Sequence, residues 1–467
     1  MNKRHYPVKR GGEYELKIEK LAFGGAGIAR MDNYVIFVNG AIPGDRILVR
    51  IQKRRSAFAE AKLLSIVEPS KHRIEPPCPY FEWCGGCTWQ NLSYDDQLKY
   101  KQDIIAESFK HIAGFEHVHV QPIIASDKPF SYRNKMEFSF SDRRWLLPDE
   151  LNVDHIRRDF ALGLHIPGTF DKVLQIDKCL LQSEKANQIL LFIKEYVVEN
   201  KLQPYGIRTH EGFLRFLVIR ESSYDSSIMI NLVTAYENTK VLKKLAQKLI
   251  KRFPTIKSVV NNINSKLAQI AVGEIEILLA GETHIQEKLG RHLFNISANS
   301  FFQTNTKQTE RLYNKVIEFA DLNGNQNVWD LYCGTGAITI FLADQSKEVV
   351  GFELVESAVN DARVNAKLHG IENAKFIGGD LLYKLQEMKD KPDVLVTDPP
   401  RSGMHAKVVE YIRDLQPAKI VYISCNPSTL ARDISILKDV YEIEIIQPVD
   451  MFPQTYHIET IVKMKSK

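Results

Sequence analysis

The sequence predicts an α/β protein that ends in a doubly wound parallel sheet and begins with a small β-barrel. From about residue 297 onward, apolar strand-like runs alternate with helical patterns, as in a parallel sheet with helices on both faces. Residues 11–69 contain short alternating runs separated by glycine turns, which is typical of a small barrel. Between them, helical and strand patterns are mixed, so we expect a central α+β domain.

The length of 467 residues is too great for one ordinary hydrophobic core. We therefore expect three domains, over residues 1–70, 71–296 and 297–467, with the segment 91–124 packing on the last of them. Residues 143–158 have no clear periodicity and are expected to form an exposed insertion.

The composition is that of a soluble globular protein, with 44% hydrophobic and 25% charged residues. The N-terminus lacks the apolar core of a signal peptide, and no run of about 18 apolar residues is present. We expect a cytoplasmic protein that does not contact a membrane. Because the net charge is only +5, binding to nucleic acid must depend on local basic patches.

One such patch follows the last barrel strand, where Lys53-Arg54-Arg55 precedes Phe58 and Lys62. Basic side chains with an aromatic residue on a small barrel fit contacts to an RNA backbone. A solvated turn explains the same residues equally well.

Four of the six cysteines lie outside the C-terminal domain: Cys78, Cys84, Cys87 and Cys179. In a reducing compartment, clustered cysteines indicate a metal site or catalysis rather than disulfides. Four thiolates suit either zinc or an iron–sulfur cluster. The spacing does not choose between them, although zinc is the commoner structural metal, and a chance cluster without metal is the third alternative.

Two strand ends near the C-terminus carry reactive side chains. Asp398-Pro399-Pro400-Arg401 and Ser424-Cys425-Asn426-Pro427 each follow a β-rich apolar run. In an open α/β sheet, ligands bind beyond the carboxyl ends of the strands, so both stretches are expected at the same rim. Cys425 is therefore a candidate nucleophile; the alternative is a small buried thiol.

A glycine turn precedes these motifs. The run from Val328 to Gly336 reads as a strand followed by Gly334-Thr335-Gly336, and a second strand ends at Glu353. A glycine turn lets the backbone approach a ligand, and an acid at a strand end can accept ribose hydroxyls. A dinucleotide is one possible ligand, but the single Gly-x-Gly suits a nucleoside cofactor without pyrophosphate better. Glycines with a purely structural role are the third reading.

The run Asp330-Leu331-Tyr332-Cys333-Gly334-Thr335-Gly336 resembles the first motif of S-adenosylmethionine-dependent methyltransferases. Together with Phe301-Phe302-Gln303-Thr304-Asn305, His457-Ile458-Glu459-Thr460 and the two strand ends, it resembles the RNA (uracil-5)-methyltransferase family. The resemblance covers nearly the whole chain and is strongest to the enzymes of 23S ribosomal RNA. It implies a Rossmann-like catalytic domain and identifies the barrel as similar to a TRAM domain.

This resemblance implies a covalent mechanism. Uracil C5 is a poor nucleophile, and addition of a thiolate at C6 converts the ring to an enolate with electron density at C5. The family assigns that addition to Cys425 and the removal of the C5 hydrogen to Glu459, which without the family reads as a surface carboxylate. Asp398 would hold the substrate ring. Arg401 would either stabilise the developing enolate or bind a phosphate.

The family pattern also implies the cofactor and metal sites. Its cofactor-binding positions correspond to Gln303, Tyr332, Glu353, Asp380 and Asp398. Ala337 replaces an Asn of some relatives, which puts a side-chain contact there in doubt, and Cys333 is interpreted as a packing residue. Ribosomal members carry a [4Fe–4S] cluster on the four cysteines, which reverses the preference for zinc. The cluster is expected to be structural, because methyl transfer needs no electrons.

The substrate uridine must be unstacked for chemistry at C5, so we expect a loop uridine that flips out of its stack. Residues 132–135 and Arg215 are candidate RNA contacts, with ordinary surface charge as the alternative. Transfer-RNA enzymes of this family typically lack the TRAM domain and the four cysteines, so ribosomal RNA and a monomeric enzyme are expected.

A uridine methyltransferase of transfer RNA is one alternative to an enzyme of ribosomal RNA. Two further alternatives belong to other functional classes. An RNA-binding iron–sulfur protein without catalysis would not require Cys425, Asp398 and Glu459 to be intact. An amino-methyltransferase of adenine or guanine would use the Pro-Pro strand end but explains neither Cys425 nor Glu459.

Overall fold

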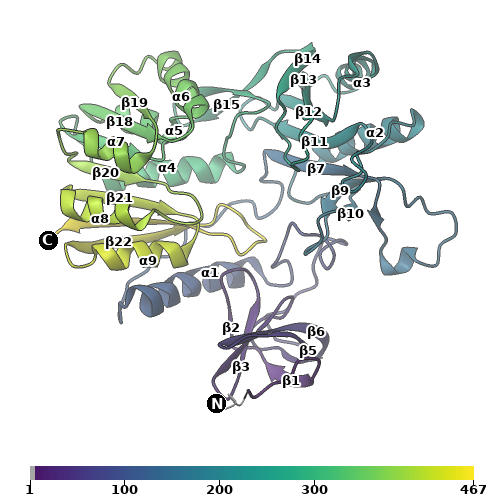
Figure 1. The fold of residues 1–467 in the computed structure, drawn as a ribbon, viewed down its shortest axis with the longest axis horizontal. Helices are drawn as coiled ribbons and strands as arrows, with labels where there is room; N and C mark the ends of the chain where they lie inside the picture. The colour runs from purple at the N-terminus through teal and green to yellow at the C-terminus, as the bar shows by residue number, and fades with distance from the viewer. Residues whose placement is uncertain (1–5) are drawn as a thin grey trace. The chain divides into compact units, whose positions relative to one another are not determined.

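The computed structural model describes residues 6–467, which divide into two compact units. Of these, unit 1 comprises residues 6–76, 88–127 and 308–467, and unit 2 comprises residues 77–87 and 128–307. Figure 1 shows the chain coloured from one terminus to the other.

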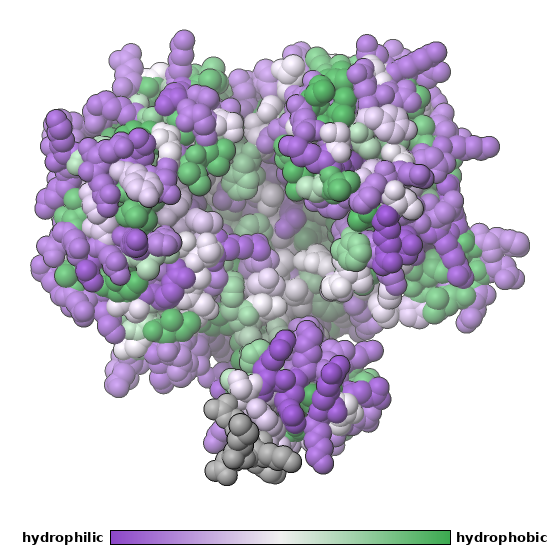
Figure 2. Space-filling view, viewed as in Figure 1, coloured by the Kyte–Doolittle hydropathy of each residue, from purple (hydrophilic) through white to green (hydrophobic). Residues whose placement is uncertain are grey.

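The N-terminal part of unit 1 is a six-stranded barrel-like sheet with the order β1-β5-β6-β4-β3-β2. Its strands are β1 (Glu13–Lys17), β2 (Lys20–Leu21), β3 (Gly27–Met31), β4 (Tyr34–Val38), β5 (Arg46–Arg54) and β6 (Phe58–Glu68). Alternate residues of β5, including Ile47, Val49 and Ile51, are buried, because successive side chains of a strand point to opposite faces. The sheet therefore has one apolar inner face and a mostly hydrophilic outer face, which Figure 2 shows in purple.

The C-terminal part of unit 1 is a seven-stranded sheet with the order β19-β18-β17-β20-β21-β23-β22. The strands are β17 (Asn327–Leu331), β18 (Glu348–Glu353), β19 (Ala374–Gly378), β20 (Val394–Thr397), β21 (Lys419–Ser424), β22 (Tyr441–Val449) and β23 (Glu459–Ser466). The helices are α4 (Thr306–Ala320), α5 (Ala337–Ala343), α6 (Glu356–Leu368), α7 (Leu381–Glu387), α8 (Ala406–Leu415) and α9 (Pro427–Leu437). The first five strands in chain order are parallel, and β23 pairs antiparallel with both β21 and β22.

Helix α1 (Tyr94–Ser108) joins this sheet although it lies far away in sequence. The Ser93 hydroxyl accepts a hydrogen bond from the backbone N–H of Asp96 at 3.1 Å, which caps the first turn of the helix. The helix continues into a π-helical turn, η1 (Phe109–Ala113). The fully buried Lys101 forms an ion pair with the equally buried Asp450, with 2.6 Å between Nζ and Oδ1. The segment thus belongs to the same compact unit as the C-terminal sheet.

Unit 2 is built on an eight-stranded sheet with the order β14-β13-β12-β11-β7-β9-β10-β8. Its strands are β7 (Lys135–Ser141), β8 (Arg144–Trp145), β9 (Ala161–His165), β10 (Val173–Gln175), β11 (Leu214–Glu221), β12 (Ile228–Thr234), β13 (Ile256–Ile263) and β14 (Ile275–Gly281). Its other elements are the 3-10 turn η2 (Pro148–Glu150), the helices α2 (Glu184–Glu199) and α3 (Thr239–Arg252), and the hairpin β15 (His284–Leu289) and β16 (His292–Ser297).

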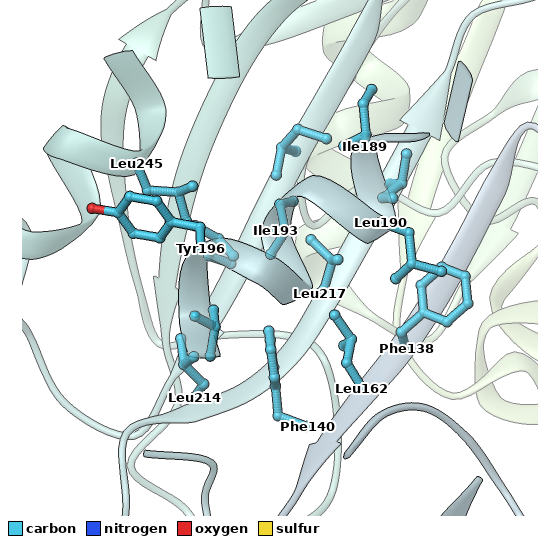
Figure 3. Packing of buried hydrophobic residues seen from close by; sticks show 14 of the residues in the cluster. Phe138, Phe140, Leu162, Ile189, Leu190, Ile193, Tyr196, Leu214, Leu217 and Leu245 are labelled. Carbon is cyan, nitrogen blue, oxygen red and sulfur yellow. The ribbon is translucent and has the colours of Figure 1, made fainter. Parts of the chain in front are cut away.

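The core of unit 2 lies between this sheet and its helices. Figure 3 shows Leu190 and Ile193 of α2 beside Phe138 of β7 and Leu217 of β11, and Ile189 of α2 belongs to the same buried cluster. These positions are spaced by one, three and four residues, which places them on one helical face. The strands and helices of unit 2 therefore share a single apolar layer.

The predicted parallel sheet and N-terminal barrel are confirmed by this topology. The three domain boundaries stay a prediction, because the structure divides the chain by compactness into two units. None of the helices within residues 6–467 combines the length and the apolar character that a membrane span requires.

Candidate active site

Three neighbouring strands bring the two predicted strand ends together. β20 pairs in parallel with β21, so that Asp398 and Cys425 follow the carboxyl ends of adjacent strands. The antiparallel register of β21 and β23 sets Ser424 opposite Thr460, so the next residues, Cys425 and Glu459, lie at the same edge. The sheet therefore collects a thiol and two carboxylates at one rim.

The turn that carries Arg401 is tied to the turn that carries Cys425. The Asn426 side chain donates a hydrogen bond from Nδ2 to the Arg401 carbonyl oxygen at 3.0 Å. Through its Oδ1, Asn426 also accepts from the Ser428 N–H at 3.1 Å and so caps helix α9. One side chain thus fixes both the start of the helix and the distance between the two strand ends.

The Cys425 thiol is half-buried, and burial is the main cause that raises its pKa, to about 11. The negative charges of Glu459 and Asp398 raise this pKa further, and the positive charge of Arg401 lowers it. At pH 7 only about one thiol in ten thousand is ionised. Cys425 is therefore a protonated thiol in the resting protein, and a proton acceptor is needed before it can attack.

Both carboxyl groups beside the thiol hold their protons more tightly than usual. Burial raises the pKa of Asp398 to about 7. Burial also raises the pKa of Glu459 well above its ordinary value, with a further rise from the charge of Asp398 and an opposing effect from Arg401. Close carboxyl groups in a poorly solvated site cannot easily be ionised together. Such groups can accept and return protons near neutral pH.

Two further titratable residues, Asp330 and Tyr313, lie close to these carboxyl groups, and the sequence predicts a catalytic role for neither. Asp330, at the end of β17, is fully buried and accepts a hydrogen bond from the Thr339 hydroxyl at 2.6 Å. Burial raises its pKa to about 7. Tyr313 of α4 is buried near Asp398, Asp330 and Glu459, and burial followed by their charges raises its pKa. The position of Asp330 in the glycine-turn motif was an available signal, whereas Tyr313 has no local signature.

The glycine turn after β17 forms a tight backbone loop. Tyr332 has a left-handed φ of 63°, and the Gly334 N–H donates to Oε2 of Glu353 at 3.0 Å. The other oxygen of Glu353 accepts from the Val355 N–H at 2.9 Å. A Cβ on Gly336 would lie 3.0 Å from Ala362, so this position leaves little space for a side chain. The turn therefore orients the Glu353 carboxylate, whose remaining lone pairs can accept hydrogen bonds from hydroxyl groups of a ligand.

Other cofactor-site candidates of unit 1 lie around this turn. Asp380 caps α7, accepting from the Leu382 N–H at 3.0 Å, and is exposed. Its negative charge acts on Tyr332, whose pKa is raised to about 12, chiefly by burial. Ala337 begins α5 and has no polar side chain to offer. Cys333 is buried against Phe376 and raised in pKa by that burial, in agreement with its interpretation as a packing residue.

Gln303 belongs to unit 2, where its loop is anchored by buried polar groups. Asn134 donates from Nδ2 to the Gln303 carbonyl at 2.9 Å and to the Thr306 hydroxyl at 2.8 Å. That hydroxyl donates in turn to the buried Glu287 at 3.0 Å. The loop conformation is well defined within unit 2, and the role of Gln303 toward a cofactor stays a prediction.

The cysteine loop also lies in unit 2, and three of its thiols influence one another. The pKa of Cys84 is raised to about 12 by burial and by the charges of Cys179 and Cys78. Burial likewise raises the pKa of Cys78 and of Cys179. Clustered, partly buried thiols that resist ionisation are the donor set that a metal cation would stabilise. Within residues 6–467, however, no group of three or more such side chains has the arrangement of a ready metal site.

Arg215 is not the surface contact that the sequence suggested. Its side chain is buried at 2% exposure and donates hydrogen bonds to the carbonyl oxygens of Asn264, Lys266 and Ala268 at 2.6, 2.6 and 2.8 Å. The guanidinium also lies over the ring of Tyr205, 4.6 Å from its centroid. Both earlier readings, RNA contact and ordinary surface charge, are wrong, because the group holds an internal loop.

The basic patch of the barrel is partly neutralised. Lys53 forms an ion pair with Glu60 at 2.8 Å, and Arg54 lies over the ring of Tyr6, 4.4 Å from its centroid. Arg55 and Lys62 are exposed. Exposed cations on the hydrophilic face remain suitable for a phosphate backbone.

Family comparisons agree with this geometry. A model of the tRNA (uracil-5-)-methyltransferase family matches residues 93–380 and 383–467, and a TRAM domain model matches residues 7–64. The chain belongs to the tRNA (uracil-5-)-methyltransferase family. The predicted family, its methyltransferase fold and the TRAM barrel are thereby confirmed.

Individual relatives of the family span nearly the whole chain. A protein of Chlorobaculum tepidum named as an uncharacterized RNA methyltransferase is 43% identical, over 91% of this chain and 90% of its own. One with the same description from Bacteroides thetaiotaomicron is 39% identical, over 95% of this chain and 100% of its own. These relatives support RNA methylation as the general activity.

A solved member of the family shares the fold over its full length. The Pyrococcus abyssi tRNA (uracil-54, C5)-methyltransferase, solved with S-adenosyl-L-homocysteine, has a TM-score of 0.74 and 29% identity. The match covers 97% of this chain and 100% of that one.

Proposed function

We propose that the protein methylates C5 of a specific uridine in 23S ribosomal RNA, with S-adenosylmethionine as the methyl donor. The observation that carries this proposal is the group of Cys425, Glu459, Asp398 and Arg401 at one sheet edge, where the pKa values of the thiol and of both carboxyl groups are raised. A nucleophile and a base that interact electrostatically are what addition and elimination on a pyrimidine require.

In the proposed cycle, the Cys425 thiol passes its proton to the Asp398 carboxylate, and its sulfur forms a bond to C6 of the uracil ring. The electron pair of the C5–C6 double bond moves toward C5 and O4, where Arg401 can stabilise the negative charge. Tyr332, Glu353 and Asp380 would hold S-adenosylmethionine, whose sulfonium group would supply the methyl group to C5. Glu459 then takes the C5 proton, and the sulfur–C6 bond breaks to release the product. The raised pKa of Glu459 makes it a stronger base than an ordinary carboxylate.

A ribosomal substrate is our first choice because of the combination of a TRAM barrel and four cysteines that the sequence carries. Transfer RNA is the second candidate, favoured by the full-length likeness to the Pyrococcus abyssi enzyme. Methyl transfer to in vitro transcripts of each RNA class, with the product nucleoside identified after digestion, distinguishes the two. Label in transfer RNA alone would overturn the first choice.

We also propose that Cys78, Cys84, Cys87 and Cys179 hold a structural [4Fe–4S] cluster. The donor chemistry supports it, since neighbouring thiols with raised pKa values gain most from a cation that stabilises their ionised forms. Iron and acid-labile sulfide in anaerobically purified protein would support the cluster; zinc without iron would contradict it.

Trapping with RNA that contains 5-fluorouridine tests the mechanism. Because fluorine replaces the hydrogen that the base must remove, the enzyme is expected to stall as a methylated covalent complex. The complex should be visible on a denaturing gel and absent with Cys425→Ala. Two results would contradict the mechanism. One is that the wild-type enzyme forms no complex with the 5-fluorouridine form of an RNA that it methylates. The other is that Cys425→Ala forms as much complex as the wild type.

A further inference from the structure

A groove of about 520 Å³ opens in unit 2 beside β8, in the insertion that follows β7. Its walls combine two tryptophans with four cationic side chains, namely Trp83, Trp145, Arg143, Arg144, Arg158 and Lys172. None of the residues that we propose for catalysis lines this groove. Figure 2 shows apolar surface among hydrophilic surface over this insertion, at the right of the view.

The aromatic side chains form a stacking surface. The rings of Trp83 and Trp145 are 6.4 Å apart between centroids and inclined by 35°. Pairing of β8 with β10 aligns Trp145 with Leu174, and this register brings Lys172 beside the indole. The Lys172 ammonium group lies over the Trp145 ring, 4.8 Å from its centroid. A flat aromatic face next to a cation is the arrangement that binds a nucleotide through its base and its phosphate.

The charges of the groove are not balanced within it. Arg144 forms an ion pair with Glu150, and Arg143 lies 3.8 Å from Asp171, whose carboxylate is shared with Arg208. No ion pair of Arg158 or Lys172 is found within residues 6–467, and Asp142 is the one carboxylate among the lining residues. The groove is therefore complementary to an anion.

We propose that this groove binds an unpaired nucleotide of the substrate RNA, with the base against Trp145 and Trp83 and the phosphate near Lys172 and Arg158. The proposal rests on the proposed function only in taking RNA as the substrate. Stacking accepts any base, so the groove would select single-stranded RNA rather than a sequence. An acidic peptide matches the charge but leaves the paired indole rings without a partner, which is why RNA is favoured.

Tryptophan fluorescence of the full-length protein provides a direct test. The chain has four tryptophans, and the other two, Trp89 and Trp329, are buried at 1% and 3% exposure. Titration with hexauridylate should quench the emission, and Trp145→Ala should weaken binding about tenfold. Trp145→Phe keeps an aromatic face and should bind nearly as well, which controls for folding.

A second pair of variants tests the phosphate contact. Lys172→Gln should reduce the slope of log affinity against log salt by about one. The matched control is Lys248→Gln, because Lys248 is exposed and lies 5.1 Å from the ring centroid of Tyr196, outside the groove. This control should leave both the affinity and the slope unchanged.

Unchanged binding by Trp145→Ala, equal binding of an RNA duplex, or equal quenching by hexaglutamate would each overturn the proposal. Cys425→Ala should bind hexauridylate like the wild type. A protein that binds hexauridylate but forms no 5-fluorouridine complex would contradict the proposed function alone. A protein that forms the complex but whose tryptophans do not respond would contradict the groove alone.

Discussion

Two clusters of acidic groups, one at the strand ends and one in the cysteine loop, differ in how many of their members a cation stabilises in the ionised form. At the strand ends, Arg401 lowers the pKa of both Cys425 and Glu459 and so opposes burial. In the cysteine loop, burial and then two neighbouring thiols raise the pKa of Cys84, which only a backbone hydrogen bond lowers; the charge of Arg133 lowers the pKa of Cys179. The first cluster is thus equipped to exchange protons by itself, whereas the second needs a cation from outside.

Glu459→Gln should give the largest effect, because it removes the proposed base and keeps the size of the side chain. Turnover should fall by about a thousandfold, and the covalent complex should accumulate even on ordinary RNA. Loss of the negative charge should also lower the pKa of Cys425, seen as faster alkylation by iodoacetamide at pH 8. Glu444→Gln, which affects a partly exposed partner of Lys463, is the control and should behave like the wild type.

Cys84→Ser tests whether the cysteine loop binds a metal. Removing one thiol should abolish metal retention and lower the Tm by about 5 °C or more, because metal binding contributes directly to folding. The measurements are metal analysis and thermal unfolding of the purified protein. Cys333→Ser, in the glycine turn of unit 1, should retain the metal; equal metal loss in both variants would show that the cysteine loop is not its site.

Arg401→Gln removes the cation that lowers the pKa of Cys425 at the strand ends. Without the cation, the pKa of Cys425 should rise further, so kcat/KM should fall about ten- to a hundredfold at pH 7 and by less at pH 9. Arg401→Lys should restore part of the activity because it restores the charge. A loss that does not depend on pH would indicate that Arg401 binds a phosphate instead.

The smallest expected effect is on stability, which Asp398→Asn should raise. The folded-state pKa of about 7 exceeds the ordinary value of 3.8, so the folded protein binds more protons between these values, and stability is lost as pH rises through this window. The amide cannot ionise, so the variant should melt a few degrees higher than the wild type at pH 8. The difference should vanish at pH 4, where both side chains are neutral in the folded protein.

The sequence predicted the parts of the site that depend on local pattern. Asp398 and Cys425 each follow an apolar strand, and parallel strands end at the same edge. Glu459 comes from an antiparallel strand, whose register with β21 no local pattern reveals. Its role was inferred only from the family resemblance.

Arg215 shows where pattern reading fails in physical terms. Seven of the eight residues of β11 are buried, because the strand is central and covered on both faces. An arginine in such a strand must satisfy its guanidinium internally, and it does so with carbonyl groups about fifty positions further along the chain. The same limit applies to Tyr313, which reaches the acidic groups only through tertiary packing.

The buried ion pair of Lys101 and Asp450 constrains the order in which the parts of this protein fold during synthesis. The two residues are 349 positions apart, so nearly the entire chain must leave the ribosome before the lysine meets its carboxylate. Residues 128–307, the larger segment of unit 2, are complete long before that moment. Domains tend to fold as units during synthesis, so residues 128–307 are expected to fold before helix α1 forms its ion pair with the C-terminal segment.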